Sequence, residues 1–231
     1  MFGLSAIIGA LFFTDSRTVL IAVGSTFLFG CLLVVILTTE QYLQASIHEA
    51  VYSDMARNEV ALVEGRDHTQ MRVYVPRTSA EEGATLFVPK HNDFRVPDGS
   101  ALDSLFVTSE TEAEEGIALR PCAASLVSDF ESRSRPLSAD PAELSVQLIG
   151  GLVEMFELAR EANAEVNREF DSIRFEVRLS AYEEEIGFDH PIVSFLGVGL
   201  ASGLDRPISV GFQISESGRY DFSVTYEIIN N

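Results

Sequence analysis

The sequence has a single lysine, Lys90, and no tryptophan. Its 16 cationic side chains are outnumbered by 35 carboxylates, which gives a formal net charge of −19 at pH 7. Such a surface repels itself in dilute salt, but at molar salt the Debye length falls to roughly 3 Å and screens the repulsion. In concentrated salt lysine is the cation to lose first, because its flexible stem exposes apolar methylenes. Arginine keeps its charge and its bidentate hydrogen bonds. We therefore expect a halophilic protein that binds no nucleic acid; an acidic protein from a lysine-poor, high-GC genome is the alternative.

Cysteine and histidine are also scarce, which limits the chemistry that we expect. The two cysteines are Cys31, inside a hydrophobic run, and Cys122, so an intramolecular disulfide is not expected. His48 and Glu49 begin H-E-x-x-Y, which lacks the second histidine of the zinc motif H-E-x-x-H. The sequence contains no P-loop and no G-x-S-x-G elbow. We predict no metal site and no cofactor.

A long hydrophobic run lies near the N-terminus. From Thr18 to Thr39 the sequence TVLIAVGSTFLFGCLLVVILTT carries no charge, and about 20 apolar residues suffice to cross a bilayer as a helix. We therefore predict a membrane anchor over residues 1–43 with its span at 18–39. A shorter apolar run, residues 2–13, is a truncated helix, the partner helix of a hairpin, or an interfacial segment. A hairpin places the following domain in the cytoplasm, which is the location that we expect.

The rest of the chain is predicted to be an amphipathic linker helix, residues 44–66, followed by a soluble α+β domain, residues 67–231. The linker helix packs on the domain or pairs with a second copy in a homo-oligomer. The runs MRVYV, TLFVP and SLFVT predict strands that are buried on both faces. Three further segments alternate apolar and polar residues and predict strands around residues 173–179, 208–214 and 220–228, the last two joined by a turn at 216–218. We expect an antiparallel sheet with one face solvated and the other covered by helices.

Three helices are predicted in this domain. The first covers residues 120–132, with Pro121 in its first turn. The second begins at Asp140 as N-cap, with Pro141 at the first helical position and a D-x-x-E capping box, and continues on one face to Ala159. The third runs from near Pro191 to about 203. Glycines at positions 150, 151, 197, 199 and 203 indicate close packing, with the last as a C-cap.

Cys122 is the one candidate catalytic residue, because a helix N-terminus and the neighbouring Arg120 both lower a thiol pKa. A small buried core residue is the alternative. The loop FVPKHNDFRVP gathers Lys90, His91 and Arg95, and it is either a contact for lipid headgroups or an anionic ligand, or a solvated loop.

The sequence resembles a family of uncharacterised haloarchaeal membrane proteins that join a two-helix hairpin to a domain of unknown function. The matching stretches are TVLIAVGSTFLFGCLLVVILTTEQYLQASIHEAVY, LFVPKH, LRPCAASLVSDFE and FDHPIVSFLGVGLASGLDRPI. The C-terminal order of helix, strand and hairpin is also similar to four-vinyl-reductase-type ligand-binding domains, without the cysteines that often bind metal there. The first resemblance implies no known activity, and the second favours binding over catalysis.

We therefore predict a membrane-anchored sensing or interaction module of a halophile, which binds a small ligand or a protein partner and contacts the lipid bilayer. The alternatives are a membrane-bound enzyme that uses Cys122 or a site assembled by the fold, and a structural envelope subunit. An apolar pocket without convergent titratable groups favours the binding module. An exposed Cys122 beside a histidine or a carboxylate favours the enzyme.

Overall fold

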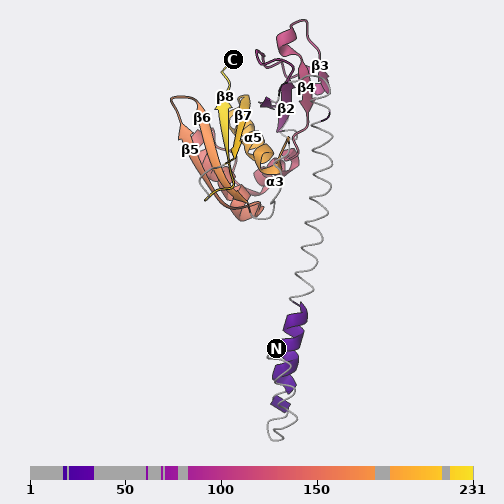
Figure 1. Cartoon of the computed structure of the whole chain (residues 1–231), viewed down its shortest axis with the longest axis vertical. Helices are drawn as coiled ribbons and strands as arrows, with labels where there is room; N and C mark the ends of the chain where they lie inside the picture. Colours follow the sequence, from indigo (N-terminus) through magenta and orange to yellow (C-terminus); the bar gives the residue numbers. More distant parts are fainter. Residues whose placement is uncertain are drawn as a thin grey trace. The chain divides into compact units, whose positions relative to one another are not determined.

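The computed structural model describes residues 18–19, 21–33, 61, 69, 71–77, 83–179, 188–214 and 219–230. The chain divides into two compact units, Met1–Tyr52 and Ser53–Asn231 (Figure 1). All labelled strands and helices below belong to the second unit.

The first unit is helical over 18–19 and 21–33, and almost all the described side chains there are exposed. Among the described residues, no helix combines the length and the apolar character needed to cross a membrane, so the predicted transmembrane helix is wrong. Residues 2–13 and, apart from Ala61, the predicted linker helix lie outside the described residues. The predicted membrane location and bilayer contact stay predictions.

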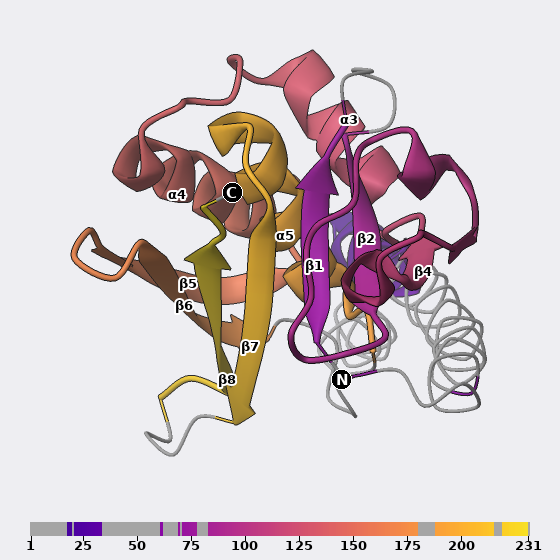
Figure 2. The ribbon, with the colours of Figure 1, turned by 90° about the horizontal axis from the view of Figure 1, so that it is seen from above.

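The second unit has the α+β class that the sequence predicts. Within the described residues, eight strands form one sheet in the order β3-β4-β2-β1-β7-β8-β6-β5, and every neighbouring pair is antiparallel. Figure 2 shows most of these strands with the helices that pack on them. The strands are β1 Arg72–Pro76, β2 Ala84–Pro89, β3 Phe106–Val107, β4 Gly116–Leu119, β5 Ala159–Asn167, β6 Ser172–Leu179, β7 Ile208–Ile214 and β8 Phe222–Ile228. The helical elements are η2 Ala101–Asp103, η3 Glu112–Glu114, α3 Ala124–Arg133, α4 Pro141–Gly150, the π turn η4 Gly151–Met155, and α5 Pro191–Leu204.

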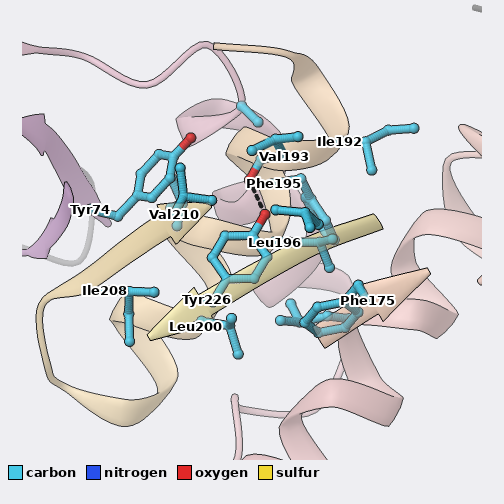
Figure 3. Packing of buried hydrophobic residues seen from close by; sticks show 14 of the residues in the cluster. Tyr74, Phe175, Ile192, Val193, Phe195, Leu196, Leu200, Ile208, Val210 and Tyr226 are labelled. Carbon is cyan, nitrogen blue, oxygen red and sulfur yellow. Dashed lines mark hydrogen bonds between the residues drawn. The ribbon is translucent and has the colours of Figure 1, made fainter. Parts of the chain in front are cut away.

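Helix α5 is the centre of the main core. Its residues from Ile192 to Ala201 are all buried, because the helix packs against β1, β2 and β7 on one side and against α3 and α4 on the other. A helix that is apolar all round fits only such an interior position. Figure 3 shows residues of this core, where the Tyr226 hydroxyl donates to the Val193 carbonyl oxygen at 2.8 Å.

The predicted glycine packing holds for α5, although the predicted glycine C-cap does not. A Cβ on Gly197 would lie 2.3 Å from the Tyr74 ring, and one on Gly199 would lie 2.4 Å from the Leu148 side chain. Gly203 packs against Leu144 instead of ending the helix. The C-cap is Asp205, whose φ of 51° places it in the left-handed region.

The two halves of the sheet are covered differently. Strand β6 alternates as predicted, with Ile173, Phe175 and Val177 buried against the helices. Strands β1 and β2 are buried on both faces, as predicted, because a second apolar cluster covers the face opposite α5. That cluster includes Val75, Phe87 and Leu102. The expectation of one fully solvated face is therefore wrong for the β1–β2–β4 half.

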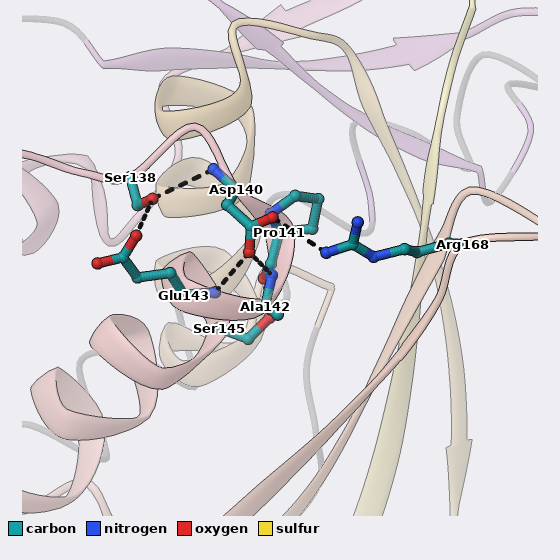
Figure 4. A network of polar contacts seen from close by, with 7 residues as sticks. All are labelled: Ser138, Asp140, Pro141, Ala142, Glu143, Ser145 and Arg168. Carbon is teal, nitrogen blue, oxygen red and sulfur yellow. Dashed lines mark hydrogen bonds and ion pairs between the residues drawn. The ribbon is translucent and has the colours of Figure 1, made fainter.

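Helix α4 starts as predicted and ends earlier. The Asp140 carboxylate accepts from the backbone N–H groups of Ala142 and Glu143 at 3.0 and 3.1 Å (Figure 4). The capping box is closed through Ser138, whose hydroxyl donates to the Glu143 carboxylate at 2.9 Å and accepts from the Asp140 N–H.

The predicted continuation of this helix to Ala159 is wrong. After the π turn η4, Glu157 has a φ of 53°, in the left-handed region, and the chain reverses into β5. Ala159 is the first residue of that strand. Gly151 packs closely, since its Cβ would lie 2.9 Å from the Phe195 ring, whereas Gly150 has no atom within 4 Å of that position.

Helix α3 starts four residues later than predicted, at Ala124. Pro121 precedes the helix in a turn that is closed by the hydrogen bond from the Ala124 N–H to the Pro121 carbonyl oxygen, at 3.1 Å. The N–H groups of Cys122 and Ala123 bind side chains near the start of α5 instead of continuing the helix backward.

Candidate functional site

Asp189 is the centre of a buried polar cluster, with 1 % of its surface exposed. Its carboxylate accepts hydrogen bonds from the Tyr74 hydroxyl at 2.7 Å, the Cys122 backbone N–H at 2.7 Å and the Ser194 hydroxyl at 3.1 Å. The Ser194 oxygen in turn accepts from the Ala123 N–H at 3.2 Å. Burial raises the pKa of the Asp189 carboxyl, and these donors oppose the rise. One carboxyl group thus joins β1, the turn before α3 and the start of α5.

His190 caps α5 with its own ring. Its Nδ1 accepts from the Ile192 N–H at 3.3 Å, and the ring lies edge-on to Phe222. Burial lowers the pKa of His190 to about 4, so the imidazole is neutral at pH 7. Burial also raises the pKa of the Tyr74 hydroxyl well above its usual value, and the neighbouring Asp189 raises it further.

Cys122, the predicted catalytic candidate, is exposed and touches this cluster. Its thiol donates to the Asp189 backbone carbonyl oxygen at 2.9 Å, while its N–H binds the carboxylate. The exposed position beside a carboxyl group meets the condition set for the enzyme alternative, and the buried-core alternative is wrong. However, the carboxyl is already engaged by donors from three elements, which is the pattern of a structural junction. The enzyme that uses Cys122 stays a prediction.

Sequence reasoning did not single out Asp189, Tyr74 or Ser194. The available signal was the pair Asp189-His190 directly before Pro191, where two polar residues precede an apolar helix. Tyr74 lies 115 positions from Asp189, so its role depends on the folded sheet.

A second candidate site is an open groove of about 550 Å³ between the end of α3 and the outer side of α4 and η4. Its volume is in the range of known binding pockets. The lining combines apolar side chains, a glycine and charged or polar groups: Phe130, Ser134, Arg135, Glu143, Val146, Gln147, Gly150, Glu154 and Met155.

One wall of this groove is held rigidly by Gln147. Its amide oxygen accepts from the Ser138 N–H at 2.9 Å, and its amide nitrogen donates to the Pro136 carbonyl oxygen at 3.3 Å. These bonds fix the connection between α3 and α4. Val146, at 71 % exposure, lies on the solvent side of α4.

The loop with Lys90, His91 and Arg95 is held by main-chain and charged contacts. Lys90 pairs with Glu115, and the Arg95 N–H donates to the Ala113 carbonyl oxygen at 2.8 Å. His91 is exposed. Within the described part of the chain, no group of three or more His, Cys, Asp or Glu side chains is arranged to bind a metal ion.

A protein-family model described as domain of unknown function DUF7982 matches residues 1–228. The chain belongs to this family. The match agrees with the resemblance to an uncharacterised family, while the haloarchaeal origin stays a prediction. No curated protein and no solved structure matches the chain.

Proposed function

We propose that this DUF7982 protein is an interaction module that binds a basic amphipathic helix of a protein partner in the groove between α3 and α4. The observation that carries the proposal is the groove itself, whose lining includes the apolar side chains of Phe130, Val146 and Met155. Amphipathic helices place apolar side chains at spacings of three to four residues into such grooves. Methionine adapts its shape to different partners.

The openness of the site favours a peptide over an enclosed small molecule. Drug-sized ligands have 70–90 % or more of their surface buried by their pockets. Val146, by contrast, is mostly exposed at the groove. A helix laid along α4 would cover this side chain while keeping its own polar face in solvent.

Charge favours a basic partner. The groove carries the carboxylates of Glu143 and Glu154 and the guanidinium of Arg135, on a chain of net charge −19. Complementary charge raises association rates and selects between partners. A mixture of apolar and charged side chains is also usual at interfaces between proteins.

The test is binding of a fluorescent helical peptide, with leucines at positions i, i+4 and i+7 and lysines on the other face, to the full chain. Fluorescence anisotropy is measured in about 1 M KCl, where the Debye length of roughly 3 Å suppresses nonspecific charge attraction. We expect Val146→Glu to weaken binding by about tenfold or more, because the bound peptide would have to cover and desolvate the new carboxylate.

Phe170→Glu is the matched control. Phe170 is 70 % exposed, close to the 71 % of Val146, and it lies outside the groove in the turn between β5 and β6. Both variants change the net charge equally. The proposal fails if the wild-type chain does not bind the peptide, or if both variants weaken binding to the same extent.

A further inference from the structure

A pocket on the other face of the sheet is lined by two arginines. Val75 of β1, Phe87 of β2 and Ala118 of β4 all belong to the apolar cluster opposite α5. Because side chains alternate along a strand, Arg77 and Arg120 lie on the same face as these residues. Strands β1 and β4 lie on either side of β2 (Figure 2). Arg77 directly follows the last residue of β1, and Arg120 directly follows the last residue of β4.

The pocket is about 430 Å³ in volume, and Thr85, Leu102 and Asp103 complete its lining together with the two arginines and backbone neighbours. Adjacent strands are about 5 Å apart, so the backbones of β1 and β4 are separated by about 10 Å. Two arginine side chains of ordinary length reach a shared ligand across that distance.

Each arginine is positioned differently. The Arg77 guanidinium donates to the Gly99 carbonyl oxygen at 3.1 Å and pairs with Asp103, and its side chain is only 15 % exposed. Asp103 is 61 % exposed. Arg120 is exposed and lies 3.5 Å from the Ser125 hydroxyl. The described lining of the pocket thus carries two guanidinium groups and one carboxylate.

We infer that this pocket binds the oxyanion group of a small ligand, a phosphoryl or a carboxylate group, between Arg77 and Arg120. The guanidinium fork matches both groups through paired charge-assisted hydrogen bonds. The Thr85 hydroxyl adds a neutral donor. Asp103 acts as a resident competitor, since its carboxylate holds Arg77 until the ligand replaces it. This site shares no lining residue with the helix-binding groove, and it adds a small-molecule binding site to the interaction module.

The experiment titrates the full chain with pyrophosphate and, separately, with citrate by isothermal calorimetry at low ionic strength. Arg120→Gln weakens binding by about tenfold or more, because it removes a charged donor. Asp103→Asn strengthens binding several-fold, because it removes the competitor. Since Arg120 and Asp103 are both exposed, these changes leave the core intact.

Arg178→Gln is the matched control, since it removes an exposed arginine from β6, across the sheet from this pocket. It should bind both probes as the wild type does. Binding of pyrophosphate alone identifies a phosphorylated ligand, and binding of citrate alone identifies a carboxylate. The inference is overturned if neither the wild type nor Asp103→Asn binds a probe, or if all variants bind alike.

Discussion

At the scale of single residues, the neighbours Asp189 and His190 are both buried, and burial shifts their pKa values in opposite directions. Burial raises the pKa of the Asp189 carboxyl and lowers that of the His190 imidazole to about 4. In both cases burial favours the neutral form. The two groups therefore make the stability of this junction depend on pH in opposite directions.

His190 gives a testable pH dependence. A pKa lowered on folding contributes stability that is present above the unfolded value of 6.5 and is lost as the pH falls toward 4. From pH 7 to pH 5, above the sequence pI of 4.4, the wild type should lose about 2 kcal/mol relative to His190→Asn. Asparagine retains an acceptor for the Ile192 N–H.

The measurement is urea unfolding of both proteins across this pH range. The difference between their slopes is the readout, because truncating a buried ring also changes the absolute stability of the variant. Parallel curves for the two proteins would contradict the role assigned to His190.

At the scale of elements, the secure predictions came from signals that are local in sequence. Pro191 starts α5, the Asp140 carboxylate caps α4, and the alternation in β6 matches its burial. Strand β5 was missed because its alanines, glutamates and arginine favour a helix. Residues 162–167 do alternate, but with small apolar side chains, and pairing with β6 decides the outcome.

The sites were harder to predict than the elements. The groove depends on how α3 and α4 pack on α5. The arginine pocket unites residues that are 43 positions apart and that follow the ends of two nonadjacent strands. Neither arrangement leaves a periodic signal in the sequence. Cys122 could be proposed from the sequence because it lies next to a predicted helix start, which is a local signal. Tyr74 also binds Asp189, but no local signal pointed to it.

The consecutive glycines at the junction of α4 and η4 give a prediction at this scale. Gly150→Ala adds a methyl group in open space and should stabilise the protein by up to about 1 kcal/mol. Gly151→Ala should destabilise it by about 1–3 kcal/mol, because the Cβ would lie 2.9 Å from Phe195 and 3.0 Å from Phe130 in the core. Urea unfolding midpoints measure both effects, and shifts of the same sign would count against this assignment of the two glycines.

At the scale of the whole molecule, the net charge of −19 predicts a strong response to salt. Raising KCl from about 0.1 M to 1 M shortens the Debye length from roughly 10 to 3 Å and screens the repulsion between carboxylates. We expect the thermal unfolding midpoint to rise across this range and then to level off as screening saturates.

A charge-reduced variant is the control for this effect. Replacing the exposed residues Glu110, Glu165 and Glu169 with glutamine changes the net charge from −19 to −16, since three negative charges are removed. The variant should gain less from KCl than the wild type does. Equal gains would mean that salt acts through general exclusion from the surface and not through screening.

The junction at Asp189 also has a consequence for how the chain folds. Its carboxyl meets a tyrosine 115 positions away and a backbone N–H 67 positions away, so both long loops have to close before the bonds form. Until then the carboxylate stays hydrated and ionised. Contacts of such long range slow folding, and the pairing of β1 with β7 spans a longer separation still, since Tyr74 and Ile208 are 134 positions apart. The same bonds that hold the finished fold therefore cannot guide its first steps.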